Sequence, residues 1–337
     1  MPKWFDQLDK DAQEKLSKTK MPSEVNPMLA TLTDNHFSDP DWLFERKLDG
    51  ERCLAFHDGK TTHLYSRKPK SLDATYPELR EALANHDTAF VVDGEIVAFD
   101  GDTSSFARLQ KRMQIKDEDE ARKSEVTVYY YIFDLLYFDG YDTSQLPLRQ
   151  RKQLLKDALT FKEPLRYTEH RDKEGERYLE EACKKGWEGL IAKDANAAYR
   201  KGRSRKWLKF KCVNQQELVI VGYTDPEGQR TGFGALLLGF YDNDQLHFAG
   251  RVGTGFDEKE LKSLHGKLTR LERKSAPVVD ASKAKTKGVH WVRPELVAEI
   301  GFTEWTSDNR LRHPKYMGLR DDKSPKDVVK EEPGARS

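Results

Sequence analysis

The stretch ERKLDGER, residues 45–52, places a lysine two positions before an Asp-Gly pair and five positions before an arginine. Lysine is a nucleophile only without its extra proton, and an unperturbed lysine with a pKa of ~10.4 is almost wholly protonated at neutral pH. Lys47 would therefore need Arg52, other cations or a metal ion close by to lower its pKa. The competing interpretation is a plain β-hairpin, because Asp-Gly between apolar stretches favours a type I′ turn. These eight residues by themselves favour the hairpin.

A second candidate for chemistry is the basic run RKGRSRKWLKFK, from Arg200 to Lys211, which holds seven Lys or Arg residues and no acid. Such a run is often a solvated face, and by itself it fits phosphate or nucleic-acid binding equally well. In WLKFK the alternation predicts a strand that buries Leu208 and Phe210 and carries Lys209 and Lys211 side by side on the other face. Two parallel ammonium groups are costly without an anion between them.

Two glutamates could hold a divalent metal ion. Glu95 in VVDGEIV and Glu188 in GWEGLIAKD each stand next to a glycine. Glycine lets the backbone approach a ligand closely, and carboxylates suit hard cations. Taken separately, each glutamate is more simply interpreted as an exposed carboxylate at the end of a strand.

The elements that must position these residues mix strands and helices without regular β-α-β alternation, which predicts an antiparallel-rich α+β domain. Hydrophobic periodicity predicts strands over 89–100, 126–140 and 188–194, and helices over 77–86, 148–159 and 174–186. After Lys211 the pattern changes to short strands over 217–225, 234–242 and 245–253, followed by a charged helix over 256–268. This pattern predicts a small β-barrel, most economically a five-stranded oligonucleotide-binding (OB) barrel.

Composition agrees with two domains. A chain of 337 residues exceeds the size at which a single core stops growing. With 37% hydrophobic and 34% charged residues it has the composition of a soluble protein with a very polar surface, and its longest apolar stretch, 233–241, is too short to span a bilayer. We expect a polar N-terminal segment over 1–24 and a flexible tail over 324–337. The chain has three cysteines, Cys53, Cys183 and Cys212, which are scattered along the sequence. Their spacing indicates neither a zinc site nor a disulfide framework, and it fits a protein of the reducing cytoplasm.

Taken together, the motifs resemble those of the covalent nucleotidyltransferases, the superfamily of ATP-dependent DNA ligases, RNA ligases and mRNA capping enzymes, whose signature is K-x-D-G-x-R. That signature reads KLDGER here, and the further motifs LYSRK, VDGEIVAF, YYIFDLLY, WEGLIAK and WLKFK follow in the family's order. The ending EWTSDNRLRHP and GLRDDK resembles that of ATP-dependent DNA ligases, and the whole chain resembles the ligase domain of bacterial and archaeal non-homologous end-joining ligases. The resemblance implies a nucleotidyltransferase (adenylation) domain over 25–212 and an OB-fold domain over 213–323.

The resemblance also implies a role for each matching residue. Lys47 would attack the α-phosphate of ATP and carry AMP, while Lys209 and Lys211 hold that phosphate. Glu95 would contact the ribose and, with Glu188, support Mg²⁺ or Mn²⁺. The remaining implied roles are adenine recognition by Glu45, adenine stacking by Phe133, contact with the ribose or nick phosphate by Arg52, 5′-phosphate binding by Arg67, further DNA contact by Arg203 and Arg205, and orientation of pyrophosphate by Arg320, Asp322 and Lys323.

The substrate leaves alternatives open. The ending GLRDDK favours nicked or broken duplex DNA over RNA, and the match around GRSRKWLKFK favours an ATP-using ligase over a GTP-using capping enzyme. A non-catalytic nucleic-acid-binding protein would be expected to have lost some of the motif residues, and none is lost.

With 46 residues before Lys47, we expect a minimal two-domain ligase without a large N-terminal clamping domain. It would act as a monomer in a prokaryotic cytoplasm near the nucleoid, with a Ku-like end-binding protein as a candidate partner, and a 3′-terminal ribonucleotide as a preferred end.

Overall fold

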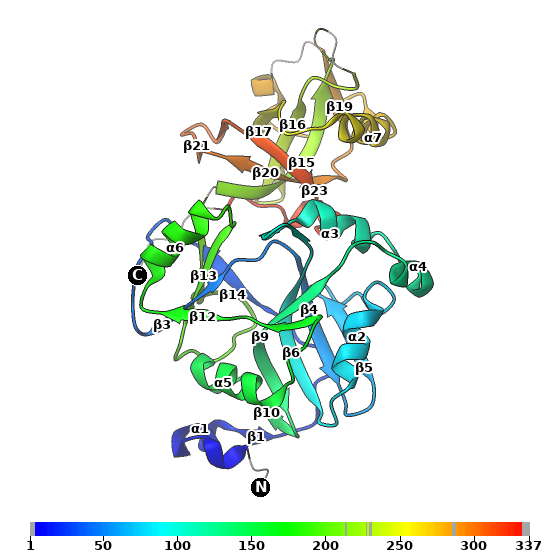
Figure 1. Cartoon of the computed structure of the whole chain (residues 1–337). Coiled ribbons are helices and arrows are strands. Elements are labelled where there is room, and N and C mark those ends of the chain that lie inside the picture. Colours follow the sequence, from blue (N-terminus) through cyan, green and yellow to red (C-terminus); the bar gives the residue numbers. More distant parts are fainter. Residues whose placement is uncertain (1–3, 213, 227, 229–230, 285–287, 332–337) are drawn as a thin grey trace. The chain divides into compact units, whose positions relative to one another are not determined.

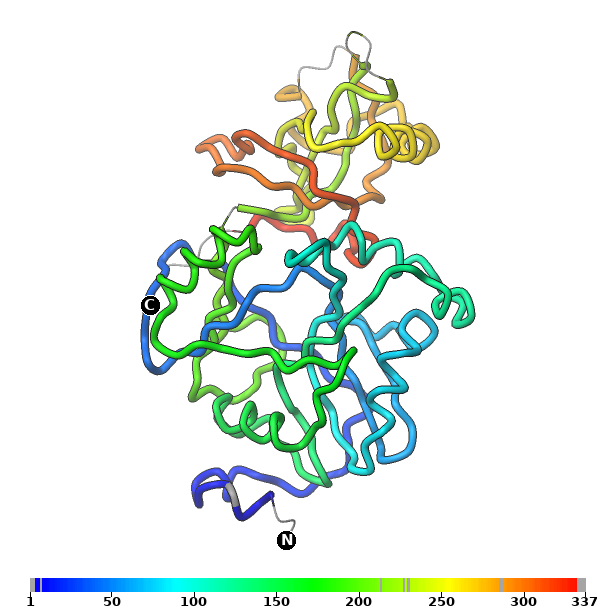
Figure 2. The backbone as a smooth tube through the Cα atoms, in the orientation of Figure 1, coloured from blue at the N-terminus to red at the C-terminus, as the bar shows by residue number. Residues whose placement is uncertain are grey.

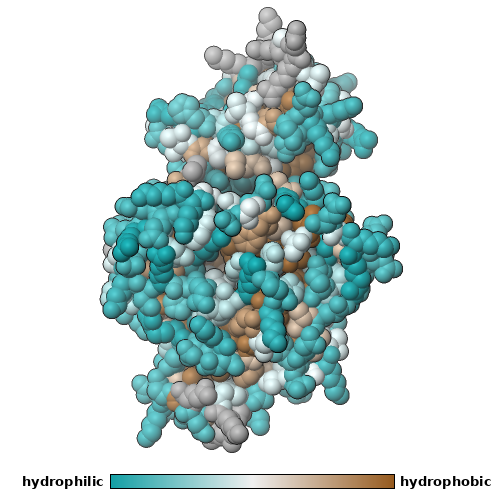
Figure 3. All heavy atoms as spheres, viewed as in Figure 1, coloured by the Kyte–Doolittle hydropathy of each residue, from teal (hydrophilic) through white to brown (hydrophobic). Residues whose placement is uncertain are grey.

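The computed structural model describes residues 4–212, 214–226, 228, 231–284 and 288–331 (Figures 1 and 2). The chain divides into two compact units, Met1–Cys212 and Val213–Glu332. Each unit has apolar clusters of its own. Hydrophilic residues cover most of the face displayed in Figure 3, as the charged fraction of 34% predicts.

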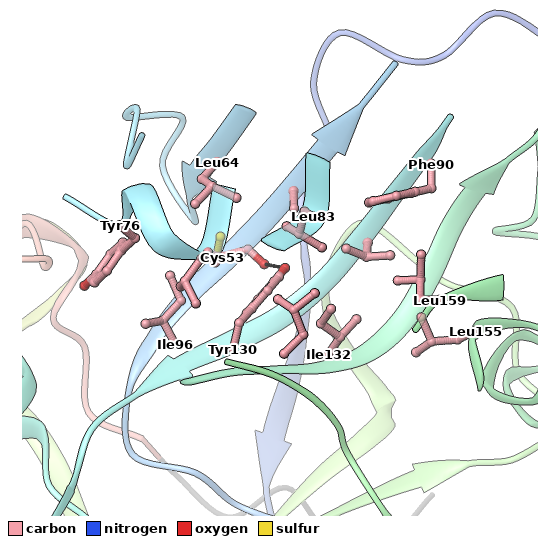
Figure 4. Close-up of a cluster of buried hydrophobic side chains, with 14 of the residues drawn as sticks. Cys53, Leu64, Tyr76, Leu83, Phe90, Ile96, Tyr130, Ile132, Leu155 and Leu159 are labelled. Carbon is pink, nitrogen blue, oxygen red and sulfur yellow. Dashed lines mark hydrogen bonds between the residues drawn. The ribbon is translucent and has the colours of Figure 1, made fainter. Parts of the chain in front are cut away.

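The first sheet of the first unit is seven-stranded and antiparallel except for one parallel pair, β11 with β9. Its strands run in the order β1 (Ser17–Lys18), β10 (Tyr141–Asp142), β9 (Tyr129–Phe138), β6 (Phe90–Val97), β4 (Glu51–His57) and β5 (Thr62–Ser66), with β11 (Leu165–Tyr167) beside β9. One face carries the main core (Figure 4), in which Leu155 of α5 packs with strand residues such as Ile132. The buried Tyr130 hydroxyl donates to the Cys53 carbonyl oxygen at 2.9 Å, so this polar group is satisfied inside the core.

The second sheet of this unit has five strands, in the order β12 (His170–Asp172), β3 (Trp42–Arg46), β13 (Gly189–Asp194), β14 (Gly202–Lys211) and β2 (Met28–Leu32). Its apolar face, with Leu208 and Phe210, packs against Tyr178 and Leu179 of α6. A further apolar cluster joins the two sheets and includes Phe133 from β9 and Trp207 from β14. The opposite face of the second sheet therefore looks toward the first sheet.

The helices of the first unit pack on the sheets and on one another, with α5 against β9 and α6 against β13. They are α1 (Lys10–Lys15), α2 (Pro77–Ala84), α3 (Phe106–Met113), α4 (Glu118–Arg122), α5 (Leu148–Ala158) and α6 (Gly175–Lys184), with a 3-10 turn at Phe5–Gln7 and a short hairpin of β7 (Phe99–Asp100) and β8 (Thr103–Ser104). The predicted helices and strands of this unit are confirmed, as is its antiparallel-rich α+β class.

The hairpin interpretation of Asp49-Gly50 is wrong. β3 pairs with β12 and β13, whereas β4 pairs with β5 and β6, so the two flanking strands lie in different sheets. Lys47 to Gly50 therefore carries the chain from one sheet to the other. The local turn signal misled because strand pairing is decided by partners distant in the sequence.

The second unit is OB-like but its strand pairings do not close into the expected barrel within the described residues. Its seven strands run in the order β17 (Gln245–Val252), β16 (Leu236–Asp242), β15 (Asn214–Thr224), β19 (Val289–Val292) and β18 (Glu272–Arg273), with β20 (Val297–Phe302) between β15 and β23 (Lys315–Leu319). Tyr316 N of β23 donates to the carbonyl oxygen of Thr254, which follows β17, at 3.0 Å. The two end strands β17 and β23 are therefore linked through a loop and not by a ladder of paired strand residues. The unit also holds α7 (Glu258–Thr269), a hairpin of β21 (Glu304–Trp305) and β22 (Leu311–Arg312), and 3-10 turns at Ala281–Ala284 and Pro325–Asp327.

The described parts of both terminal segments are packed and not loose. Trp4 donates from Nε1 to Asp139 Oδ2 at 3.0 Å, and Ala12 of α1 is buried in the main core. At the other end, the expectation of a flexible tail from residue 324 is wrong for 324–331, because Val328 is buried and its carbonyl accepts from Tyr241 N at 2.7 Å. Residues 332–337 lie outside the described residues. In each segment a buried apolar side chain, Ala12 or Val328, holds the chain in place, and the polar composition of the segments did not indicate this.

The cysteines also depart from expectation. Cys183 near the end of α6 and Cys212 after β14 form a disulfide, and Cys53 is buried as a free thiol. Disulfides are uncommon in reducing compartments, and a sequence separation of 29 residues gave no sign of the pairing. Within the described ranges, no helix combines the length and apolar character that a membrane span needs.

Candidate active site

The KLDGER segment is fixed by backbone contacts to both sheets. Lys47 N donates to Gly189 O at 2.9 Å, which extends the β3–β13 pairing by one residue. Asp49 N donates to Ser104 Oγ at 3.2 Å. Gly50 passes so close to β6 that a Cβ there would lie 2.2 Å from Ile96 O. Glycine is therefore required at position 50 for close approach, and not for a hairpin turn.

Lys47 and Glu188 are in direct contact. The Lys47 Nζ atom lies 2.5 Å from Glu188 Oε1, and the Glu188 side chain is 9% exposed. Glu188 stands immediately before β13, where its carbonyl accepts from Cys212 N at 3.0 Å. Its second carboxylate oxygen, Oε2, is buried without a hydrogen-bond partner among the described residues. The structure thus brings together two residues that are 141 positions apart in the sequence, and it leaves a buried acceptor beside the nucleophile candidate.

Lys209 and Lys211 occupy the face of β14 that looks toward the first sheet. In the β13–β14 register, Lys211 is opposite Gly189 and Lys209 is opposite Ile191. Both lysines are partly exposed, whereas Phe210 between them is buried against α6. The strand, its buried face and the paired lysines are therefore as predicted. Because Gly189 follows Glu188, the Lys211 position lies one residue from the carboxylate that contacts Lys47.

Arg52 and Glu95 are directly opposite each other in the β4–β6 register. The Arg52 guanidinium is held in a bidentate ion pair by Asp93, with Nη2 2.6 Å from Oδ2, and Asp93 is fully buried. Burial would lower the pKa of Arg52, but the Asp93 carboxylate outweighs it and raises that pKa above its ordinary value. Tyr199 also donates to Asp93 Oδ2, at 2.6 Å. Arg52 is thus a rigid, permanent cation.

Phe133 lies between cations at the junction of the sheets. Its ring centroid is 4.0 Å from Lys193 Nζ and 4.7 Å from the Arg52 guanidinium carbon, and the ring packs edge-on against Trp207. The side chain is buried in the apolar cluster that joins the sheets. Phe133 is therefore a core aromatic that also contacts cations of the candidate site. Stacking on adenine stays a prediction.

Glu45 is buried and bound by two lysines that the sequence analysis did not single out. Lys152 Nζ of α5 lies 2.6 Å from Oε1, and Lys193 Nζ of β13 lies 2.6 Å from Oε2. Burial would raise the pKa of Glu45, but the two lysines together lower it below its ordinary value. Burial lowers the pKa of Lys193 to about 8, because one carboxylate cannot fully compensate two buried ammonium groups.

The DNA-binding candidates of the first unit are on its surface. Arg67 is exposed in the loop between β5 and α2. Arg203 and Arg205 are exposed on the first half of β14, where the pairing with β2 shifts register between Ser204 and Leu208. Arg203 also donates to Ala30 O at 3.0 Å. These arginines are accessible to a phosphate backbone but are not gathered into the buried cluster around Lys47.

The candidates of the second unit form ion pairs within that unit. Arg320 is bidentate to Asp322, at 2.9 and 3.0 Å, and also contacts Glu299 at 3.3 Å. Burial opposes ionisation of Asp322, but Arg320 outweighs it and lowers the pKa of that carboxyl. Lys323 Nζ lies 2.8 Å from Glu217 Oε1. Contact of these residues with pyrophosphate stays a prediction.

Some of the missed residues carried a usable signal. Asp93 and Lys193 stand inside the motif stretches VDGE and EGLIAKD. Lys152 carried none, because a lysine in a charged helix is normally solvated and its partner Glu45 is 107 positions away.

Replacing Gly50 by alanine is expected to destabilise the first unit by about 1–3 kcal/mol, the usual cost of overpacking. The added Cβ would overlap Ile96 O at 2.2 Å and Val97 Cγ1 at 2.7 Å. Gly266 of α7 is the matched control, because a Cβ there meets nothing within 4 Å and alanine favours a helix. Urea unfolding curves of both variants check the prediction, and equal stability of Gly50→Ala and wild type would contradict it.

Comparison with known proteins identifies the family. The chain matches the family described as ATP dependent DNA ligase domain over residues 27–211. It matches the family described as ATP dependent DNA ligase C terminal region over residues 229–323. The first match covers more than half of the chain and includes the Lys47–Glu188 contact. The chain belongs to the ATP-dependent DNA ligases. The resemblance inferred from the motifs is confirmed, with a nucleotidyltransferase domain followed by an OB-like domain.

Relatives within this ligase family include large multifunctional proteins. The chain is 35% identical over 324 residues to the multifunctional non-homologous end joining protein LigD of Pseudomonas aeruginosa. The alignment covers 94% of this chain and 38% of that protein. It is 38% identical over 313 residues to the multifunctional non-homologous end joining DNA repair protein LigD of Mycobacterium tuberculosis. That alignment covers 90% of this chain and 40% of the relative. The chain spans about two fifths of the length of these curated relatives.

A solved ligase structure supports the same assignment. The structure described as mycobacterial DNA ligase D complexed with ATP and MES is 36% identical to this chain, with a TM-score of 0.65. The alignment covers 91% of this chain and 98% of that chain. Both units of the present chain therefore have counterparts in a ligase.

Proposed function

We propose that this chain seals 5′-phosphate/3′-hydroxyl breaks in duplex DNA, using ATP and a covalent AMP intermediate on Lys47. The observation that carries the proposal is the Lys47–Glu188 contact of 2.5 Å at the strand ends, beside the Lys209 and Lys211 face of the same sheet. In register, Lys47 and Lys211 stand on either side of Gly189, so further lysines lie on the same sheet face as the nucleophile candidate and suit binding of the phosphate anion that it would attack.

In the first step, the neutral amine of Lys47 would attack the α-phosphate of ATP, forming a P–N bond as the bond to pyrophosphate breaks. Lys209 and Lys211 would offset the negative charge that grows on the α-phosphate oxygens. The AMP group would then pass to the 5′-phosphate of the DNA, and a 3′-hydroxyl would displace it. The transfer to DNA breaks the P–N bond and regenerates the Lys47 amine.

A divalent metal ion fits beside Glu188. The buried Oε2 atom of Glu188, which has no hydrogen-bond partner among the described residues, is available as a carboxylate ligand. Glu95 lies close to the segment that follows Lys47, because a Cβ at Gly50 would be 3.0 Å from Glu95 Cγ. The described residues contain no cluster of three or more His, Cys, Asp or Glu side chains placed to hold a metal. Mg²⁺ commonly takes one or two carboxylates and completes its shell with water and substrate phosphates. When bound, Mg²⁺ or Mn²⁺ would neutralise phosphate charge.

Arginines and the second unit would supply the DNA contacts. Arg67, Arg203 and Arg205 are exposed and would bind backbone phosphates, so affinity should fall steeply with salt and depend weakly on sequence. Arg52 would contact the ribose or the nick phosphate. In the second unit, Arg320 and Lys323 would orient pyrophosphate during the first step.

The cellular role that we propose is repair of broken DNA by end joining. Its support is the identity of 35–38% to proteins whose names state non-homologous end joining. A prokaryotic cytoplasm, a monomeric enzyme, a Ku-like partner and a preference for a 3′-terminal ribonucleotide belong to this proposal. Comparing sealing rates of nicks with a 3′-deoxy- or 3′-ribonucleotide tests the last of these, and equal rates would exclude it.

Covalent labelling tests the central proposal. The wild-type chain, freed of bound AMP by pyrophosphate, is incubated with a divalent metal and α-labelled ATP or GTP, and the protein is resolved on a denaturing gel. We expect label from ATP only, and transfer of the label to nicked duplex DNA in preference to nicked RNA. Label from GTP only would indicate a capping-type enzyme, transfer to RNA only would indicate an RNA ligase, and no label from either would leave a non-catalytic binding protein.

A further inference from the structure

We propose that Lys152 is a positioning residue for nucleotide selection, which together with Lys193 holds Glu45 as an ionised acceptor for the 6-amino group of adenine. The inference rests on the proposed function, because it requires that Lys47 takes up a nucleotide. It goes beyond that function by assigning the choice of base to a buried charge cluster that is anchored outside the motif segments, on α5.

The cluster is buried, and its ionic contacts are short. Glu45, Lys152 and Lys193 are each at most 2% exposed. Lys152 Nζ contacts Glu45 Oε1 at 2.6 Å and also donates to Thr168 O at 2.9 Å. Its helix is anchored in the main core through Leu155 (Figure 4). The Lys152 ammonium therefore has little freedom to leave the carboxylate.

The carboxylate is on the correct face to meet a nucleotide bound at Lys47. Glu45 and Lys47 are two positions apart at the end of β3, so their side chains leave the same face of the sheet. In register across that face, Glu45 is opposite Ile191, and Ile191 is opposite Lys209. Glu45 thus stands in one row with a lysine expected to hold the α-phosphate. Lys193 lies two residues further along β13, opposite Leu43 and Trp207, and its ammonium nitrogen is 4.0 Å from the Phe133 ring centroid.

The charge of the cluster is not explained by stability. Three buried ionic groups are costly to desolvate, and replacing such a set by apolar residues is often neutral or stabilising. Two lysines around one carboxylate also leave an excess of positive charge. A structural role alone would need only one of them, whereas keeping Glu45 ionised in a buried site benefits from both.

An ionised Glu45 discriminates between bases by hydrogen-bond direction. A carboxylate accepts only, and each of its oxygens retains a lone pair beyond the one facing a lysine. Adenine offers a 6-amino donor, whereas the 6-oxo group of guanine is an acceptor and would face the carboxylate unpaired. A protonated Glu45 could donate to that oxo group, and the two lysines prevent this state.

The test compares covalent labelling with ATP, with purine riboside triphosphate, which lacks the 6-amino group, and with GTP. Wild type is expected to favour ATP over both analogues. Lys152→Met should reduce the ATP-to-purine ratio of kcat/KM at least tenfold, mainly through ATP, and Lys152→Arg should restore part of it. A ratio measured on one sample is independent of the fraction of protein that is folded.

Two variants of α5 serve as controls. Lys156→Met removes an exposed lysine one turn away, which lies 3.9 Å from Glu169. Arg151→Met removes a buried cation of the same helix, which is paired with Asp134 at 2.6 Å. Both should keep the wild-type ratio, although Arg151→Met should unfold more easily.

An unchanged ratio in folded Lys152→Met would overturn the inference while leaving ATP labelling, and hence the proposed function, intact. If Lys152→Met does not fold, Glu45→Gln replaces it, because an amide both donates and accepts and should weaken the preference for ATP over GTP at least tenfold. An unchanged preference in Glu45→Gln would also overturn the inference. Absence of label in wild type would instead refute the proposed function itself.

Discussion

Lys47→Arg is expected to take no label from ATP, a loss of at least about 1,000-fold, as for removal of other enzymatic nucleophiles. Arginine keeps the positive charge that faces Glu188 at 2.5 Å, so the local ion pair and the fold should survive. The guanidinium does not deprotonate in proteins and cannot form the phosphoramidate. The prediction therefore separates nucleophilicity from charge. A single-turnover labelling assay measures it.

The third chemical step provides an internal check on Lys47→Arg. A nicked duplex that already carries AMP on its 5′-phosphate does not need the lysine nucleophile, so the variant should still seal it. Lys206→Arg is the matched control, since Lys206 forms an exposed pair with Asp194 at 2.8 Å and should keep normal labelling. Loss of label in Lys206→Arg, or retained label in Lys47→Arg, would contradict the assignment of the nucleophile.

Features that depend on local periodicity could be predicted from the sequence. The strand that carries Lys209 and Lys211 follows directly from its two-residue alternation, and the apolar half of that pattern is the half that packs on α6. The helices over 77–86 and 148–159 were equally visible from their spacing. The motif order was sufficient to predict the family.

Features that depend on distant partners could not be predicted from composition or spacing. Asp49-Gly50 has the sequence of a hairpin turn, yet the neighbouring strands find their partners in β13 and β6. Lys152 resembles a solvated helix residue until the fold brings Glu45 to it. The disulfide between Cys183 and Cys212 depends on α6 packing against β14, which no local signal encodes.

Asp93→Asn is expected to lower the free energy of unfolding by about 3–5 kcal/mol, the usual cost of removing one partner from a buried ion pair. Asparagine preserves the size of the side chain, but the Arg52 guanidinium would keep its charge beside a neutral amide. Tyr199, which donates to Asp93 at 2.6 Å, would lose a charged acceptor as well. Because Asp93 fixes Arg52 toward the site, we also expect sealing of a pre-adenylated nick to fall about 10–100-fold per folded molecule, as for loss of other outer-shell positioning contacts.

Asp134→Asn distinguishes a positioning role from plain loss of stability. Asp134 is as deeply buried as Asp93 and is held by Arg151 in a comparable bidentate pair, at 2.6 and 2.9 Å. That pair ties β9 to α5 and makes no contact with Arg52, so Asp134→Asn should lose similar stability but retain sealing per folded molecule. Circular dichroism at low temperature gives the folded fraction, and a gel assay gives the sealing rate. Equal activity losses in the two variants would mean that Asp93 acts on stability only, and that Arg52 needs no fixed orientation to contact the DNA.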